Sequence, residues 1–238
     1  MDAFSGVADF VRMTSAKLHD KNFLAFLKLE PNSFVVFDKA YIHYLQFAIW
    51  STKKIWFVTR MKDNAVYHVT KVIIDRSRKK GATGVVKEQY ILLTYKDRIG
   101  ELKKLPLRRI TFKADDGKMY YFITNNFKIT PETVAAIYKN RWMIELLFKQ
   151  IKQNFPLKYF WGESENAIRT QIYCVLIAQL LMVVIKKKAC SKKSFANIIT
   201  VIRLHLMSYV ELFAFIKDTY KAWRKNNSPP GQVRMKMN

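Results

Sequence analysis

The stretch FVVFD, residues Phe34–Asp38, decides how the fold of this sequence is interpreted. Four consecutive apolar residues are typical of a strand buried on both faces. The run ends at a carboxylate, and open α/β sheets hold functional residues at the carboxyl ends of their strands. A helix over Ile42–Trp50 and a second buried strand over Ile55–Val58 are expected to follow. The sequence therefore predicts an α/β core with Asp38 at its functional edge.

The residues around this core predict further elements of both kinds. Upstream we expect a strand within Phe4–Met13, a short helix over Asp20–Leu27 capped by Asp20, and a turn at Pro31–Ser33. Between about residues 60 and 126 the sequence changes to β-branched and aromatic runs separated by charged or glycine-containing turns. These runs predict strands at Val66–Ile74, Gln89–Tyr95, Ile110–Lys113 and Met119–Thr124, and a hairpin turn at Asp115-Asp116-Gly117.

From Thr130 onward the pattern is helical. Thr130 is suited to cap a helix, and Pro131 and Glu132 to occupy its first turn. Helices are predicted over about 131–154, 163–188, 194–204 and 208–223, and residues 226–238 are expected to be a disordered tail. The expected organisation is a partial core over 1–59, a β-rich insertion over 60–126 and a helical continuation of the core over 127–225.

Charge points to a polyanionic partner. The chain holds 42 lysines and arginines against 18 aspartates and glutamates, a formal net charge of +24. Each cation that meets a phosphate releases condensed counterions, so such an excess favours nucleic acid. A ribosomal protein, a protein of a membrane surface or a merely soluble chain would share this excess.

The cysteines and the apolar runs bear on the cellular compartment. Cys174 and Cys190 are too few for a disulfide framework or a zinc site, and Cys174 is expected in the core. The longest apolar run, Tyr173–Ile185, is shorter than the roughly 20 residues that a bilayer needs, so we expect a buried helix and no membrane partner. Met1–Val11 lacks the apolar region of a signal peptide, and a cytoplasmic location is expected.

The first predicted helix after Thr130 carries four side chains that are suited to binding metal or phosphate. At 100° per residue, Tyr138, Arg141, Glu145 and Lys152 share an arc of roughly 60°. An apolar stripe beside them is formed by Ile144, Leu147, Phe148, Ile151 and Phe155. A carboxylate flanked by two cations and a phenol fits a phosphate and metal site. Charges at these spacings are also ordinary features of an amphipathic helix surface.

This segment resembles the insertion-sequence-four family of bacterial DDE transposases, whose signature is Y-x2-R-x3-E-x6-K. Tyr138, Arg141, Glu145 and Lys152 match it residue by residue. The run Ile123–Asn126 and the residues Trp142, Ile144, Phe148 and Lys149 are also similar to that family, as are His19-Asp20 and Val36–Tyr41 around the second catalytic Asp. The resemblance extends over about residues 4–205.

The resemblance implies an RNase H-like core interrupted by a β-rich insertion between the second Asp and the Glu. It also implies cut-and-paste DNA transposition, with Asp38 and Glu145 as catalytic residues and ligands for Mg²⁺ or Mn²⁺. Arg141, Lys152 and Tyr138 would bind phosphates of double-stranded DNA at transposon ends and target. A homodimer when full length and a location at the bacterial nucleoid are implied as well.

The sequence departs from that family at its beginning. The family requires a first Asp on a strand well before the second Asp, but Asp2, Asp9 and Asp20 all lie too close to Asp38 for the intervening strands. Lys39-Ala40 also replaces the usual Arg-Gly. We therefore expect a truncated transposase, with the N-terminal strands missing, that is inactive alone. Open alternatives are a non-catalytic DNA-binding remnant, an inhibitor of full-length transposase, or another nuclease on the same fold.

Two basic clusters are secondary candidates for DNA contact. One is formed by Lys186–Lys188 with Lys192 and Lys193, for which a solvated helix end is the alternative; the other is Arg76 with Arg78–Lys80. Trp142 is expected to pack at the edge of the site, and Trp161 and Trp223 are expected to be packing residues.

Overall fold

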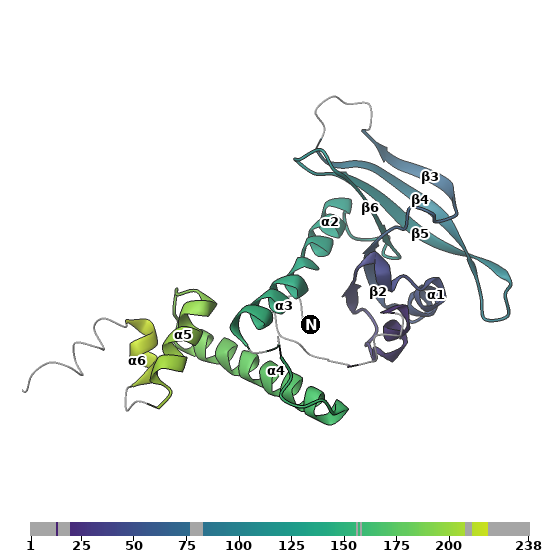
Figure 1. Ribbon diagram of the computed structural model, residues 1–238. Helices are drawn as coiled ribbons and strands as arrows, with labels where there is room; N and C mark the ends of the chain where they lie inside the picture. The colour runs from purple at the N-terminus through teal and green to yellow at the C-terminus, as the bar shows by residue number, and fades with distance from the viewer. Residues whose placement is uncertain are drawn as a thin grey trace, which may run out of the picture. The chain divides into compact units, whose positions relative to one another are not determined.

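The computed structural model describes residues 13, 20–76, 83–155, 157, 159–207 and 211–218 (Figure 1). It divides into two compact units, one holding Phe10–Met143 with Met1–Ser5, the other holding Ile144–Asn238 with Gly6–Asp9. The strand expected within Phe4–Met13 lies outside the described residues except for Met13.

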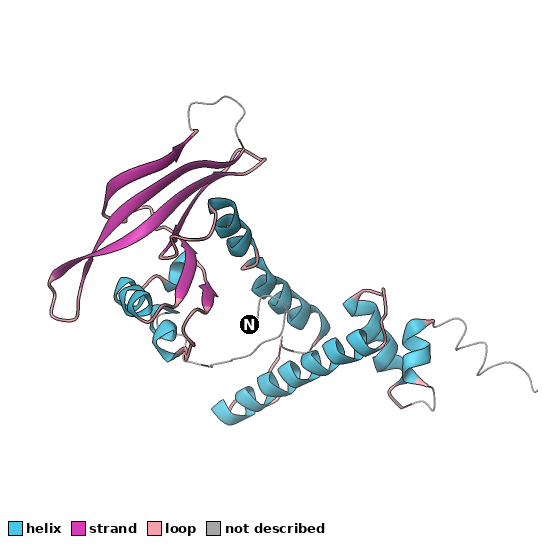
Figure 2. Cartoon of the chain, turned by 180° about the vertical axis from the view of Figure 1, so that it is seen from behind, coloured by secondary structure: helices cyan, strands magenta, loops and turns pink. Residues whose placement is uncertain are grey.

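The first unit contains one six-stranded sheet of mixed direction (Figure 2). Its order is β1-β2-β6-β5-β4-β3; β1 and β2 are parallel, and all other neighbours are antiparallel. The bounds are β1 Phe34–Val36, β2 Trp56–Arg60, β3 Tyr67–Asp75, β4 Gly84–Lys96, β5 Leu102–Lys113 and β6 Met119–Thr124. All six predicted strands from Phe34 onward are confirmed, β4 and β5 being much longer than expected. The α/β class is confirmed too.

The strands between residues 60 and 126 continue the same sheet as β1 and β2. β2 pairs with β6 through Val58↔Thr124 and Thr59↔Ile123, so the last strand of the β-rich block returns beside the core strand. The predicted hairpin turn joins β5 to β6, and Gly117 adopts φ 82°, which favours glycine. The chain therefore leaves the core after β2 and returns beside β2 as β6, directly before the first helix of the helical half, α2, begins.

Two helices cover opposite faces of this sheet. Successive residues of β6 separate the faces, since Phe122 packs in one apolar cluster and Ile123 in the other. Helix α1, Tyr44–Thr52, contributes Phe47 and Trp50 to the cluster of Ile123. Helix α2, Pro131–Lys139, packs in the cluster of Phe122. The sheet is thereby buried on both sides at β2 and the end of β6, whereas β1 is only partly buried, with Phe34 exposed, so the expectation of full burial for this strand is wrong.

Short helical segments precede and follow β1. The helix predicted over Asp20–Leu27 is a 3-10 helix, η1 Asp20–Phe26. The turn at Pro31–Ser33 is confirmed, with Asn32 in the left-handed region at φ 67°. A second 3-10 helix, η2 Lys39–Tyr41, begins directly after Asp38.

The single helix expected over 131–154 is wrong in one respect. It is two helices, α2 and α3 Trp142–Asn154, separated at Asn140-Arg141. There the amides of Asn140 and Arg141 bond to the carbonyls three residues earlier, which tightens the chain into a 3-10-like turn. Asparagine favours such turns over helix interiors. A constant 100° per residue therefore does not relate Tyr138 to Lys152.

The second unit is helical. It holds α4 Glu165–Lys188, α5 Phe195–His205 and α6 Leu212–Lys217. Ser164 and Ser194 cap α4 and α5 through their side-chain oxygens. A small core is formed by Ala189, Ile198, Ile202 and Ile216. The described helix α6 is shorter than the predicted 208–223, and the predicted disordered tail lies outside the described residues.

Three expectations about burial in the second unit are wrong. Cys174 is exposed rather than in the core, and Trp161 is 90% exposed rather than packed. The helix expected to be buried, α4, buries Val175 and Gln179 but exposes a row of apolar side chains: Tyr173, Ile177, Leu181 and Val184. An apolar run does not say which of its faces finds a partner. Trp223 lies outside the described residues.

Helix α4 also bears on the expectation of no membrane partner. It is 24 residues long, and its most apolar window has a mean hydropathy of 1.9, so length and composition alone would let it cross a bilayer. Of the helices in the described residues, α4 alone meets both criteria. Core helices of soluble proteins share these two properties.

Candidate active site

Asp38 lies just beyond the end of β1, as predicted. Pairing between the parallel strands continues to Phe37, whose amide donates to the Val58 carbonyl and whose carbonyl accepts from the Thr59 hydroxyl. The next residue is Asp38, which caps η2 by accepting from the Ala40 amide at Oδ1, 3.1 Å away. The carboxylate is thus fixed by the strand before it and the turn after it.

The second carboxylate oxygen of Asp38 accepts from an arginine of the neighbouring strand. Arg60 ends β2, and its Nη2 lies 3.3 Å from Asp38 Oδ2. The two side chains are 32% and 30% exposed, so the ion pair faces water on one side. Arg60 Nε is buried and has no hydrogen-bond acceptor among the described residues. Arg60 therefore neutralises Asp38 through one bond and keeps unused donor capacity.

Tyr138 of α2 is the second side chain of the site. It is buried against Phe122 of β6, with ring centroids 4.8 Å apart. The Arg60 and Arg141 guanidinium carbons lie 6.0 and 5.6 Å from its ring centroid, within range of a cation–π interaction. The Tyr138 hydroxyl is buried and, although close to Arg60, makes no hydrogen bond of good geometry with the described residues.

The charges around Tyr138 act against one another. Burial raises the pKa of Tyr138, Arg60 and Arg141 oppose that rise, and Asp38 adds to it. Asp38 and Arg141 are therefore both near enough to the phenol to influence it. The first unit thus brings together three of the predicted site residues, Asp38, Tyr138 and Arg141, around Arg60.

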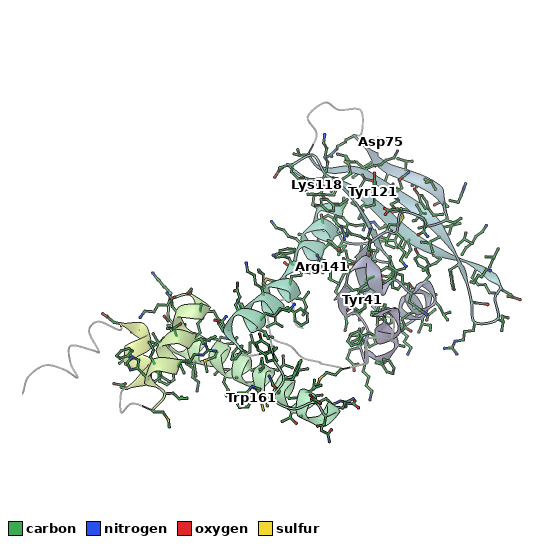
Figure 3. The ribbon with its side chains drawn as sticks, in the orientation of Figure 1. Tyr41, Asp75, Lys118, Tyr121, Arg141 and Trp161 are labelled. Carbon is green, nitrogen blue, oxygen red and sulfur yellow. The ribbon has the colours of Figure 1, made fainter. Side chains whose placement is uncertain are left out.

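Arg141 occupies the turn between α2 and α3 (Figure 3). Its amide bonds to the Tyr138 carbonyl at 3.0 Å, so the turn itself sets the spacing of the two side chains. The four site residues therefore do not form one stripe on a single helix face, because Arg141 lies in the turn between two helices. Trp142, which follows, is 54% exposed.

A buried polar framework holds the start of α2. Arg108 of β5 donates to Glu88 of β4 through Nε and Nη2, at 2.9 and 2.6 Å, and to the carbonyls of Asn126 and Ile129 through Nη1. Asn125 accepts from the Phe57 amide and donates to the Ile55 carbonyl and the Ser51 hydroxyl. These bonds tie the loop before α2 to β2, β4 and β5.

A shallow pocket of about 430 Å³ adjoins Asp38. It is lined by Asp38, Lys39, Ala40, Lys62, Asp63 and Asn64. Lys39 forms an ion pair with Asp63, with 3.5 Å between Nζ and Oδ2. Two lysines and two carboxylates thus border an open volume next to the end of β1.

Glu145 and Lys152 belong to α3 within the second unit. Glu145 is half-buried and Lys152 is exposed. Leu147 and Ile151 of the predicted apolar stripe are buried, whereas Phe148 of the same stripe is 54% exposed. Among the described residues no group of three or more histidine, cysteine, aspartate or glutamate side chains could together hold a metal ion.

Arg60 was not identified from the sequence. The signal available was its place two residues after the predicted strand Ile55–Val58, as Asp38 lies close after the preceding strand. That signal becomes informative only when the two strands are known to be parallel neighbours. Of the secondary basic candidates, Arg76 is exposed, and Arg78–Lys80 lie outside the described residues.

Comparison with known proteins gives one consistent family. The transposase DDE domain matches residues 1–181. The protein y4zB of Sinorhizobium fredii, which bears a transposase name, is 35% identical over 71% of this chain and 47% of its own length. A protein named as a transposase for insertion sequence element IS5377 of Geobacillus stearothermophilus is 27% identical over 62% and 38%. One from element IS4SA of Synechocystis is 29% identical over 68% and 44%.

The chain spans less than half the length of these relatives. A solved structure, the piggyBac transposase synaptic complex with hairpin DNA, aligns with this chain at a TM-score of 0.47 and 11% identity. The alignment covers 93% of this chain and 44% of the piggyBac chain. The likeness to that structure is too low to add to the sequence match. The family match covers most of the chain, and the chain therefore belongs to the DDE transposase family.

Proposed function

We propose that this chain provides two of the three carboxylates of a transposase active site, Asp38 and Glu145, on an RNase H-like core. The observation that carries the proposal is the position of Asp38, held at the end of a parallel strand beside Arg60, Tyr138 and Arg141. Cut-and-paste transposition requires hydrolysis and transfer of phosphodiester bonds in double-stranded DNA. Guanidinium and phenol groups suit the phosphates of that substrate.

The residues fit a divalent cation such as Mg²⁺ or Mn²⁺. Asp38 is partly exposed, and its Oδ2 already lies against a positive group, the guanidinium of Arg60. Asp38 and Glu145 would hold the ion, since hard cations prefer carboxylate oxygens. When bound, such ions activate the attacking oxygen and stabilise the leaving oxygen of a phosphoryl transfer.

The other side chains serve to bind and orient DNA. Arg141 presents a guanidinium that can contact a phosphate through two parallel bonds. Tyr138 offers a buried hydroxyl beside it, and Lys152 adds an exposed positive charge on α3. These three contacts position a strand without reading its sequence.

With two of three carboxylates, the chain alone is expected to bind DNA but not to turn it over. The test is a hairpin-cleavage and strand-transfer assay with Mn²⁺ on the wild-type chain, Asp38→Asn and Glu145→Gln, beside Mn²⁺ titration followed by electron paramagnetic resonance. Mn²⁺ binding that both variants weaken would support the site. Turnover that depends on Glu145 would overturn the inactivity, and Mn²⁺ binding unaffected by either variant would overturn the site.

A further inference from the structure

Arg60 uses little of its hydrogen-bonding capacity among the described residues. It makes one bond to Asp38, at 3.3 Å, which is long for a charge-assisted hydrogen bond. Its Nε is buried with no acceptor among the described residues, and its side chain is 32% exposed. An arginine placed only to stabilise the fold would be expected to use more of its five donors, as a buried donor left unused costs free energy.

The carboxylate that Arg60 contacts is the one that the proposed function assigns to the metal. Oδ1 of Asp38 is held by the Ala40 amide, so Oδ2 is the oxygen with more freedom to change partners. A guanidinium and a divalent cation cannot occupy the same side of one oxygen. The bound cation must therefore compete with Arg60 for Asp38.

An arginine displaced from Asp38 has an anionic partner at hand when DNA is bound. Its carbon lies 6.0 Å from the Tyr138 ring centroid, and Arg141 lies 5.6 Å from the same centroid. Two guanidinium groups near one tyrosine ring give this place a positive potential that attracts an anion. A DNA phosphate bound beside Tyr138 would give the buried Nε of Arg60 an acceptor.

We propose that Arg60 is an exchangeable cation, which pairs with the Asp38 carboxylate in the metal-free chain and passes to a DNA phosphate when a divalent ion takes Asp38. This rests on the proposed function, because it takes Asp38 as a metal ligand. Arg60 is thus a substrate-positioning residue beyond the four-residue signature. It links metal binding to DNA binding, since either ligand releases the group that the other requires.

The first test measures Mn²⁺ affinity of the purified chain by electron paramagnetic resonance. Arg60→Gln should bind Mn²⁺ about two- to fivefold more tightly than wild type, the range expected when a partly exposed ion pair is removed. Arg109→Gln is the matched control. Arg109 also lies over tyrosine rings of the same sheet, 4.5 Å from Tyr121, but bonds to the Gln89 amide instead of a carboxylate. Its loss should leave Mn²⁺ affinity unchanged.

The second test measures how salt weakens binding to a short blunt-ended DNA duplex, with and without Ca²⁺ as a divalent ion. Without Ca²⁺, the salt dependence of wild type and Arg60→Gln should be alike, because Arg60 is engaged with Asp38. With Ca²⁺, wild type should gain about one phosphate contact over Arg60→Gln. Arg60→Lys keeps the charge and should recover most of that gain. Arg109→Gln should show no dependence on Ca²⁺.

The outcomes separate this inference from the proposed function. If Asp38→Asn weakens Mn²⁺ binding but Arg60→Gln fails to strengthen it, the exchange is wrong and the metal site stands. If the wild type and Arg60→Gln differ in salt slope equally with and without Ca²⁺, Arg60 does not pass between partners. If Asp38→Asn has no effect on Mn²⁺ affinity, the proposed function itself fails.

Discussion

Two arginine–carboxylate pairs lie on the same sheet and differ in almost every respect. Arg108–Glu88 is 3% and 5% exposed, and Arg108 uses three nitrogens to reach one carboxylate and two backbone carbonyls. Arg60–Asp38 is about one-third exposed and consists of one bond. A pair in which every arginine nitrogen is bonded supports the fold, whereas we propose that a pair with spare capacity at a strand end can exchange partners.

The largest expected effect is on the buried pair. Glu88→Gln leaves the Arg108 charge buried with neutral acceptors only, and we expect the free energy of unfolding to fall by about 3–5 kcal/mol. Urea denaturation measures it. Asp38→Asn is the matched control and should change stability by less than about 1 kcal/mol, as its partner reaches water. Joint replacement, Glu88→Leu with Arg108→Met, should recover much of the loss. Equal losses for Glu88→Gln and Asp38→Asn would contradict the comparison.

The next largest effect is expected in the loop before α2, the helix that holds Tyr138 beside the Arg60–Asp38 pair. Asn125→Ala removes bonds to the Phe57 amide, the Ile55 carbonyl and the Ser51 hydroxyl, leaving buried groups unsatisfied. The free energy of unfolding should drop by about 2–3 kcal/mol in thermal or urea denaturation. Asn64→Ala, in an exposed turn, serves as a control and should be nearly neutral. A neutral Asn125→Ala would mean that the framework is not needed.

The pH dependence of stability should depend on Tyr138, whose ring lies near the Arg60 and Arg141 guanidinium groups. Burial raises the folded-state pKa of Tyr138 above its usual 10.0. The stability that this provides is fully present below pH 10.0 and is lost as pH rises through the folded-state pKa. Tyr138→Phe should therefore flatten the decline of stability at alkaline pH, measured by urea denaturation across pH. Burial also raises the pKa of Tyr44, so Tyr44→Phe is the comparison variant. An unchanged alkaline decline in Tyr138→Phe would refute this.

The smallest effect is expected at the basic end of α4. Replacing Lys186–Lys188, Lys192 and Lys193 by glutamine should flatten the salt dependence of DNA affinity, if these lysines meet phosphates. Lys186–Lys188 lie in the last turn of α4, where positive charge also stabilises the helix end. The control replaces five exposed lysines of the first unit: Lys28, Lys53, Lys54, Lys71 and Lys104. If replacing the five lysines at the end of α4 leaves the salt dependence of DNA affinity unchanged, those lysines only make the chain more soluble.

Much of the first unit could be predicted because its patterns are local. The FVVF run indicated a strand, which is observed but only partly buried, and the terminal Asp38 indicated a functional edge. Thr130-Pro131 fixed the start of α2, and its side-chain cap is observed. Tyr138 and Arg141 were predicted both from helical spacing and from the family signature, and the turn at Asn140-Arg141 makes the helical spacing wrong while leaving the signature match intact.

What could not be predicted depends on contacts between distant residues. Arg60 reaches Asp38 only because β1 and β2 are parallel neighbours, and nothing in either run encodes that pairing. Cys174 and Trp161 were expected to be packed because apolar residues usually are, but their burial depends on which helix face meets a partner. The continuity of the sheet through β2 and β6 was hidden for the same reason.

The most direct test of the central claim asks whether Asp38 and Glu145 share one divalent cation. Fe²⁺ can replace Mg²⁺ at carboxylate sites, and with ascorbate and peroxide it cleaves the backbone near where it is bound. Fragments of the wild-type chain, mapped by mass spectrometry, should end close to both Asp38 and Glu145, and Asp38→Asn or Glu145→Gln alone should abolish both cuts. Cleavage near one residue that survives loss of the other would contradict the shared site.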